Sequence, residues 1–190
     1  MFRWITCWAA RTGGIWPPEM DRPARKPNRL TGYDYRQPGC YFVTICTKGK
    51  RHLFWNESPP SMGVGADIIR PWMERLSPVG LLVEQAIREI PVHYPNVIVE
   101  NHVVMPNHVH ILLSIEGGGG RIISAPTTAL STIVGQMKRA VAKRAGFPIW
   151  QKGYHDHIVR GDADHLRVWE YMDTNPAKWR EDRYFTETEE

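Results

Sequence analysis

Two apolar, β-branched runs separated by only two residues constrain the fold of this chain more than any other feature. The runs read NVIVENHVVM (residues 96–105) and HVHILLSI (residues 108–115), and Pro106 and Asn107 stand between them. Proline at the second position of a tight turn, followed by asparagine, is typical of a type I turn. The sequence therefore predicts a β-hairpin whose second strand begins at His108.

Further strand and helix patterns flank the hairpin on both sides. The segments CYFVTICTK (residues 40–48) and PIWQKGYHDHIVR (residues 148–160) predict a strand and an extended piece. Apolar residues recur at helical spacing in three segments, which span residues 77–90, 127–145 and 162–175. This order of strands and helices predicts an α+β sandwich, with helices packed on a mostly antiparallel sheet.

Capping residues and prolines indicate where the helices begin and end. Ser77 suits an N-cap, and Pro78 suits the first helical position after it. Pro91 and Pro176 are expected to stop the first and the last helix, because proline lacks a backbone N–H and clashes with the preceding turn.

The composition limits the classes of protein to which the chain can belong. The chain has 190 residues, which favours one domain with a sizeable core, and its net charge of +4 weakly indicates a polyanionic partner. Three cysteines without a CxxC spacing argue against a disulfide framework and favour a reducing, cytoplasmic location. No apolar run approaches the roughly 20 residues that span a bilayer, so we expect no membrane partner.

Two histidines open the second strand of the hairpin. His108 and His110 are two residues apart, so their side chains point to the same face of a strand. Neighbouring imidazoles can share one divalent metal ion. An H-x-H pattern by itself is more often the polar side of an amphipathic strand, hydrogen-bonded to its neighbours or to water.

The last predicted helix carries a phenol and a carboxamide on one face. Tyr171 and Asn175 are four residues apart and therefore project together. On a helical wheel Tyr171 lies away from Leu166 and Trp169, which we expect to anchor the helix. The alternative is that Tyr171 packs at the margin of the core and Asn175 only caps the helix end.

Four segments resemble, in the same order, the REP-associated branch of the HUH single-tyrosine transposases. RLTGYDYRQPGCYFVTICTKGKRHLF resembles the opening strand of that branch, and VVMPNHVHILL resembles its histidine–hydrophobic–histidine motif. STIVGQMKRAVAKR resembles the basic helix, and IWQKGYHDHIVRGDADHLRVWEYMDTNPAKW resembles the final segment, with a tyrosine four residues before Asn-Pro. The similarity covers about residues 29–179.

The resemblance implies a ferredoxin-like, RRM-like α+β domain that acts on single-stranded DNA beside hairpins of repeated palindromes. It gives His108 and His110 the role of metal ligands, and Asn175 that of the polar residue that can complete the site. The ion would be Mg²⁺ or Mn²⁺. Tyr171 would be the nucleophile, which cleaves and rejoins DNA strands through a 5′-phosphotyrosine intermediate.

On this basis we divide the chain into three parts. Residues 1–29 form a basic, proline-rich extension without periodicity, which we expect to be irregular. Residues 30–182 form the catalytic domain, and residues 183–190 form an acidic tail. We expect the protein to act as a monomer or a homodimer.

Basic residues around the motifs are expected to contact DNA phosphates. These residues are Arg29, Lys138, Arg139, Lys143, Lys152 and Arg160.

Two other functions fit the same residues. One is a metal-dependent phosphodiesterase that uses water as nucleophile, and the other is a nucleic-acid-binding module that does not cut. Asp173 lies near Tyr171 in sequence and could assist a metal or repel phosphate. The sequence names no base for Tyr171. His155, His157 and His165 are candidates by residue type only, and histidines of this kind are more often structural or solvent-exposed. His102 belongs to the neighbouring strand and has a weaker claim.

Overall fold

The computed structural model describes residues 32–56, 72–117 and 129–187. The N-terminal extension with Arg29, and the first residues of the helix predicted from 127, lie outside these ranges.

The core of the fold is a four-stranded sheet in the order β2-β3-β1-β4. Its strands are β1 (Gly39–Cys46), β2 (Val97–Val104), β3 (His108–Ile115) and β4 (His155–Val159), and each neighbouring pair is antiparallel. The predicted hairpin is confirmed, because β2 pairs with β3 across a turn made of Pro106 and Asn107. Across this turn the backbone N–H of Met105 donates to the carbonyl of His108 at 2.9 Å.

Four α-helices accompany the sheet in the described ranges. They are α1 (Pro78–Arg88), α2 (Ile90–His93), α3 (Leu130–Ala145) and α4 (Asp162–Thr174). Three single-turn 3₁₀ helices span Lys48–Lys50, Met73–Arg75 and Trp179–Glu181. No helix of these ranges is both long and apolar enough to cross a bilayer.

The start of α1 is as predicted, and its end is not. The Ser77 hydroxyl accepts a hydrogen bond from the backbone N–H of Gly80 at 3.1 Å, as an N-cap should. The helix stops at Arg88, and Pro91 lies in the first turn of α2. Proline is tolerated there because the first turn has no intrahelical partner for its missing N–H.

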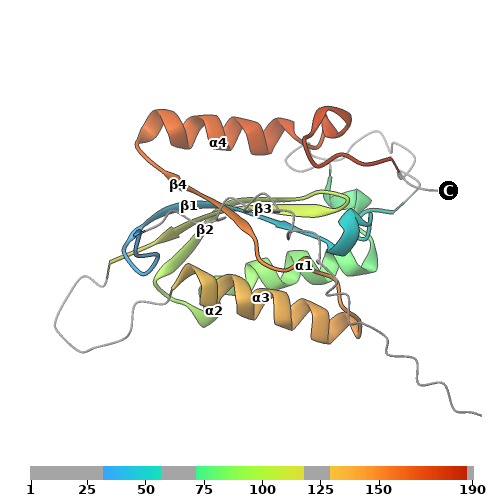
Figure 1. Ribbon diagram of the computed structural model, residues 1–190, viewed down its shortest axis with the longest axis horizontal. Coiled ribbons are helices and arrows are strands. Elements are labelled where there is room, and N and C mark those ends of the chain that lie inside the picture. Colours follow the sequence, from blue (N-terminus) through green and yellow to red (C-terminus); the bar gives the residue numbers. More distant parts are fainter. Residues whose placement is uncertain (1–31, 57–71, 118–128, 188–190) are drawn as a thin grey trace, which may run out of the picture.

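The helices form two layers, one on each side of the sheet (Figure 1). The helices α1, α2 and α3 cover one face, and α4 lies alone on the other face. Alternate residues of β1, namely Tyr41, Val43 and Ile45, are fully buried in the hydrophobic core. This β-α-β-β-α-β order confirms the predicted ferredoxin-like α+β sandwich, with α4 as an additional C-terminal helix.

The face by which α4 is anchored differs from the prediction. The buried side chains of α4 are Val168 and Met172, whereas Leu166 is 57% exposed. Trp169, the other predicted anchor, is partly buried and packs against the core. On the helical wheel Val168 lies about 60° and Met172 about 100° from Tyr171, so the anchored face borders the side of the helix that brings Tyr171 to the sheet.

Candidate active site

His108 and His110 form the centre of the candidate site. Their side chains lie on the same face of β3, and both residues are buried, at 0% and 1% exposure. The two Nε2 atoms are 3.0 Å apart, with the ring planes at 74°. The pair therefore presents two imidazole nitrogens to one point, as two ligands of one ion would.

Both rings are oriented through their other nitrogen. The Nδ1 of His108 is 2.8 Å from Asn107 Oδ1, and the Nδ1 of His110 is 2.9 Å from the hydroxyl of Thr44, its cross-strand partner. Hydrogen bonds of this kind fix the tautomer and the ring orientation of metal-binding histidines.

Asn107 determines which nitrogen of His108 is available. Its Nδ2 donates to the carbonyl of Tyr184 at 2.9 Å, so its Oδ1 is the acceptor facing the histidine. The proton of His108 then lies on Nδ1, and the lone pair of Nε2 points at His110. Tyr184 is buried although it follows residue 182, so the packed chain continues into the segment predicted as a tail.

Burial keeps both imidazoles neutral. It lowers the pKa of His108 to about 4. The pKa of His110 lies well below its ordinary value, because of burial first and then because of the neighbouring His108 and the Arg183 charge. Neutral imidazole is the form that binds a metal, so neither ring has to lose a proton at neutral pH.

A third donor, which is charged, completes this group. Asp182 offers a carboxylate oxygen, and the donor atoms of Asp182, His108 and His110 all lie within 4.8 Å of one another. Adjacent ligands of an octahedral ion with bonds of about 2.1 Å lie about 3 Å apart, which matches the separation of the two nitrogens. The residues present therefore fit a divalent ion with nitrogen and oxygen ligands.

Asn175, the predicted third ligand, lines a cleft together with His110 and Tyr171. It is 3% exposed, and its buried Nδ2 has no hydrogen-bond partner within the described part of the chain. The unpaired atom is an amide donor, whereas a metal would take the carboxamide oxygen. The ligand role of Asn175 therefore stays a prediction.

Tyr171 contacts the histidine pair within a single chain. Its hydroxyl lies 3.2 Å from His110 Nε2 and donates to Asp182 Oδ2 at 2.9 Å. Its ring stands edge-on to Phe42, with the centroids 6.0 Å apart. Burial and the Asp182 carboxylate both raise the pKa of Tyr171, so the phenol keeps its proton in this arrangement.

A cleft of about 420 Å³ opens beside Tyr171 and His110. Lys178 and Arg183 are among its lining residues, and both are exposed. The exposed Glu181 lies in the same lining, so the cleft combines a buried polar floor with a rim of mixed charge, in which Lys178 and Arg183 are the groups that can contact phosphates.

The predicted DNA-binding residues lie elsewhere. Lys138 donates to the carbonyls of Gln151 and Gly153 at 2.8 and 2.7 Å, which braces the segment before β4. Arg139 and Lys143 are exposed on α3, on the other side of the sheet from α4 (Figure 1).

The two remaining residues of the predicted DNA-binding set, Lys152 and Arg160, are also exposed. Lys152 precedes β4, and Arg160 lies between β4 and α4.

His155 is exposed, with its ring centroid 6.5 Å from that of Tyr184. The other groups considered as helpers of Tyr171 have hydrogen-bond partners elsewhere. His157 bonds to Asp164 at 2.8 Å, and His165 bonds to Glu100. His102 bonds to Glu84 at 2.6 Å. Asp173 accepts from Asn101 rather than facing the cleft.

Sequence reasoning missed Asp182, Lys178 and Arg183. They follow α4 in irregular chain around a 3₁₀ turn, where no periodicity indicates the direction of a side chain. Asn107 was read only as a turn residue, although its position directly before His108 could have indicated an orienting role.

Comparisons with known proteins bear on the fold and on the family of the chain. No protein-family model matches the chain. An uncharacterized protein of Haemophilus influenzae is 31% identical over 181 residues, which cover 86% of this chain and 94% of that one. The solved structure of a REP-associated tyrosine transposase bound to a REP hairpin matches 80% of this chain and 74% of that chain, with a TM-score of 0.52 at 17% identity. The chain therefore belongs to one family with the Haemophilus influenzae protein, and its fold is that of the REP-associated tyrosine transposase.

Proposed function

We propose that this protein cleaves and rejoins single-stranded DNA beside hairpins through a phosphotyrosine intermediate on Tyr171. The observation that carries the proposal is the contact of 3.2 Å between Tyr171 Oη and His110 Nε2 within one chain. The fold of a transposase whose solved structure holds a REP hairpin supports the choice of substrate.

In this proposal the two histidines hold a divalent ion, Mg²⁺ or Mn²⁺, with an oxygen from Asn175 or Asp182. When bound, the ion supplies positive charge beside a phosphate oxygen. Thr44 and Asn107 orient the two rings through hydrogen bonds with the Nδ1 atoms of His110 and His108. Burial disfavours the protonated imidazoles, so the Nε2 lone pairs stay available for the ion.

Tyr171 Oη attacks phosphorus, and the new O–P bond forms as the bond between phosphorus and the 3′-oxygen breaks. The phenolic proton passes to Asp182 Oδ2, which already accepts it at 2.9 Å. The 3′-oxygen takes a proton from solvent and leaves as a hydroxyl. Attack by a 3′-hydroxyl on the phosphotyrosine reverses these steps and rejoins a strand without ATP.

All of these groups come from one chain, so we propose that one copy of the protein suffices for cleavage. The exposed Lys178 and Arg183 at the rim of the cleft would hold the phosphates on either side of the scissile bond.

The test is to incubate the purified protein with a 3′-labelled single-stranded oligonucleotide that contains a hairpin, with Mn²⁺ or Mg²⁺, and to separate the products on a denaturing gel. We expect a protein–DNA adduct that is absent in Tyr171→Phe and in chelator, and strongly reduced in His110→Ala. Tyr184→Phe is the matched control, because Tyr184 also lines the cleft and should be dispensable for adduct formation.

The gel also separates the two competing functions. Nicks without any adduct, unchanged in Tyr171→Phe, would identify a phosphodiesterase that uses water. A mobility shift of the hairpin without nicks in either metal would identify a binding module.

A further inference from the structure

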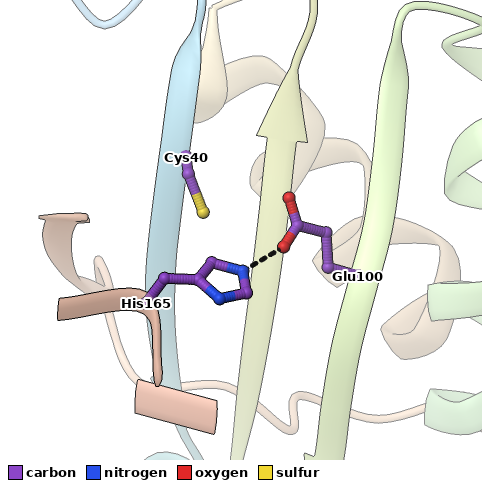
Figure 2. A group of neighbouring side chains, drawn as sticks. All are labelled: Cys40, Glu100 and His165. Carbon is purple, nitrogen blue, oxygen red and sulfur yellow. Dashed lines mark hydrogen bonds and ion pairs between the residues drawn. The ribbon is translucent and has the colours of Figure 1, made fainter. Parts of the chain in front are cut away.

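A second group of ligand-type side chains lies under α4, outside the histidine pair. Cys40 of β1, Glu100 of β2 and His165 of α4 converge between the helix and the sheet (Figure 2). Their sulfur, oxygen and nitrogen donor atoms all lie within 4.8 Å of one another. Each of the three residues is half-buried, so the group is packed and still open to solvent.

The fold directs each of these side chains to one place. The β2–β3 register shifts between Val99 and Asn101, and this bulge re-aims the side chain of Glu100. Glu100 accepts from the hydroxyl of Ser114, which pairs with Cys40 across β1 and β3. His165 Nε2 lies 2.5 Å from the other oxygen of Glu100.

We propose that Cys40, Glu100 and His165 bind one Zn²⁺ ion, with water in the fourth position. A thiolate, an imidazole and a carboxylate are the three ligand types of Zn²⁺ sites in proteins. The thiolate distinguishes this group from the nitrogen and oxygen donors around His110, because soft sulfur selects Zn²⁺ over Mg²⁺ and Mn²⁺. Binding releases the thiol proton of Cys40 to solvent.

Such an ion would fasten α4 to two strands. Val168 and Met172 are the buried residues of this helix, and Trp169 is partly buried against the core, so few apolar side chains anchor it. His165 precedes Tyr171 by six residues, or about 9 Å along a helix. The Zn²⁺ site would therefore hold the helix that carries Tyr171, without contributing an atom to the reaction.

The test uses Co²⁺ as a spectroscopic substitute in the full-length His110→Ala variant, in which the first site lacks a ligand. We expect a thiolate-to-cobalt charge-transfer band that saturates at one equivalent. Adding Cys40→Ser should abolish the band, and adding His165→Ala should weaken Co²⁺ binding at least tenfold. The same titration with Cys7→Ser or Cys46→Ser should retain the band, as should His157→Ala.

A stability measurement keeps the test decisive if a variant folds poorly. Zn²⁺ should raise the unfolding temperature of the His110→Ala variant, and this rise should be lost when Cys40→Ser is added, with an unchanged circular dichroism spectrum. Absence of a thiolate band, or a band that survives Cys40→Ser, would mean that Glu100 and His165 form an ion pair only. Neither readout needs DNA, so the outcome is independent of the proposed cleavage.

Discussion

Asn107 sets the chemistry of the histidine that follows it. Its Nδ2 is held by the carbonyl of Tyr184, and its Oδ1 therefore receives the Nδ1 proton of His108. This residue is fully buried and is not among the residues that line the cleft. Its effect on the reaction is indirect. Because Asn107 holds the proton of His108 on Nδ1, the lone pair of this ring is on Nε2, where it can bind the ion.

Replacing Asn107 by alanine should weaken the metal site and the fold together. We expect Mn²⁺ affinity to fall about 10- to 100-fold, as for other residues that orient metal ligands. The free energy of unfolding should fall by about 1–3 kcal/mol, because buried partners lose their hydrogen bonds. Calorimetric Mn²⁺ titration and urea unfolding measure the two effects.

The control for this variant is Asn56→Ala, which removes an exposed side chain bonded to the carbonyl of Leu76. It should leave Mn²⁺ affinity unchanged. Equal affinity in Asn107→Ala and the wild type would show that His108 needs no orienting partner.

At the scale of elements, the strands and α1 follow from local sequence, whereas the orientation of α4 does not. The hairpin and the Ser77 cap depend on residues next to one another, so the sequence predicts them. The prediction for α4 assumed that its most apolar side chains face the sheet. The sheet beneath α4 is partly polar, and the helix instead presents Val168, Met172 and Tyr171 to it.

The irregular chain after α4 was less predictable still. Asp182 reaches the histidines only because a 3₁₀ turn redirects the backbone after Lys178, and such a turn has no hydrophobic period. The sequence thus predicts the two histidines and the tyrosine as site residues, while the carboxylate beside them required the structure.

The anchoring of α4 can be tested with a matched pair of substitutions. Met172→Ala should lower the free energy of unfolding by about 2–5 kcal/mol, because Met172 is 1% exposed and alanine leaves a cavity. Leu166→Ala should change it by less than about 0.5 kcal/mol, because Leu166 is 57% exposed. Urea unfolding measures both losses. A larger loss for Leu166→Ala than for Met172→Ala would mean that Leu166 anchors the helix, as the sequence predicted.

At the scale of the whole molecule, the sheet separates two functions. One face holds the apolar core under α1 and α3, and the other holds the polar site under α4 (Figure 1). The basic residues at the cleft and those on α3 therefore lie in different layers.

This separation predicts which basic residues matter for DNA. The double variant Lys178→Ala/Arg183→Ala should bind single-stranded DNA about tenfold more weakly. The slope of the logarithm of the binding constant against the logarithm of salt concentration should become shallower by about 0.7 per lost phosphate contact. The variant Arg139→Ala/Lys143→Ala removes the same amount of positive charge from α3 and should lose less affinity for single-stranded DNA. Fluorescence anisotropy over a salt series measures both, and an equal or larger loss from the α3 pair would place the DNA on that layer.

The buried histidines also make the stability of the metal-free protein depend on pH. The folded state holds the pKa of His108 near 4, whereas an unfolded chain restores a value of about 6.5. The unfolded state therefore binds more protons below about pH 6.5, and the free energy of unfolding falls as the pH falls.

Between pH 7 and pH 5 we expect a loss of about 2 kcal/mol from His108 alone. Urea unfolding in chelator at the two pH values measures this loss, and a His108→Gln/His110→Gln variant should show a smaller one. An unchanged free energy of unfolding in the wild type would mean that the histidines are not buried as neutral rings.

The central claim is that Tyr171 is the residue that becomes joined to DNA, and peptide mapping of the adduct tests it most directly. The adduct formed with Mn²⁺ and a hairpin oligonucleotide is digested with protease and nuclease, and the modified peptide is sequenced by mass spectrometry. The account predicts a nucleotide attached through its 5′-phosphate to the Tyr171 side chain. Attachment at Tyr184 or any other residue, or a 3′-phosphate linkage, would contradict it.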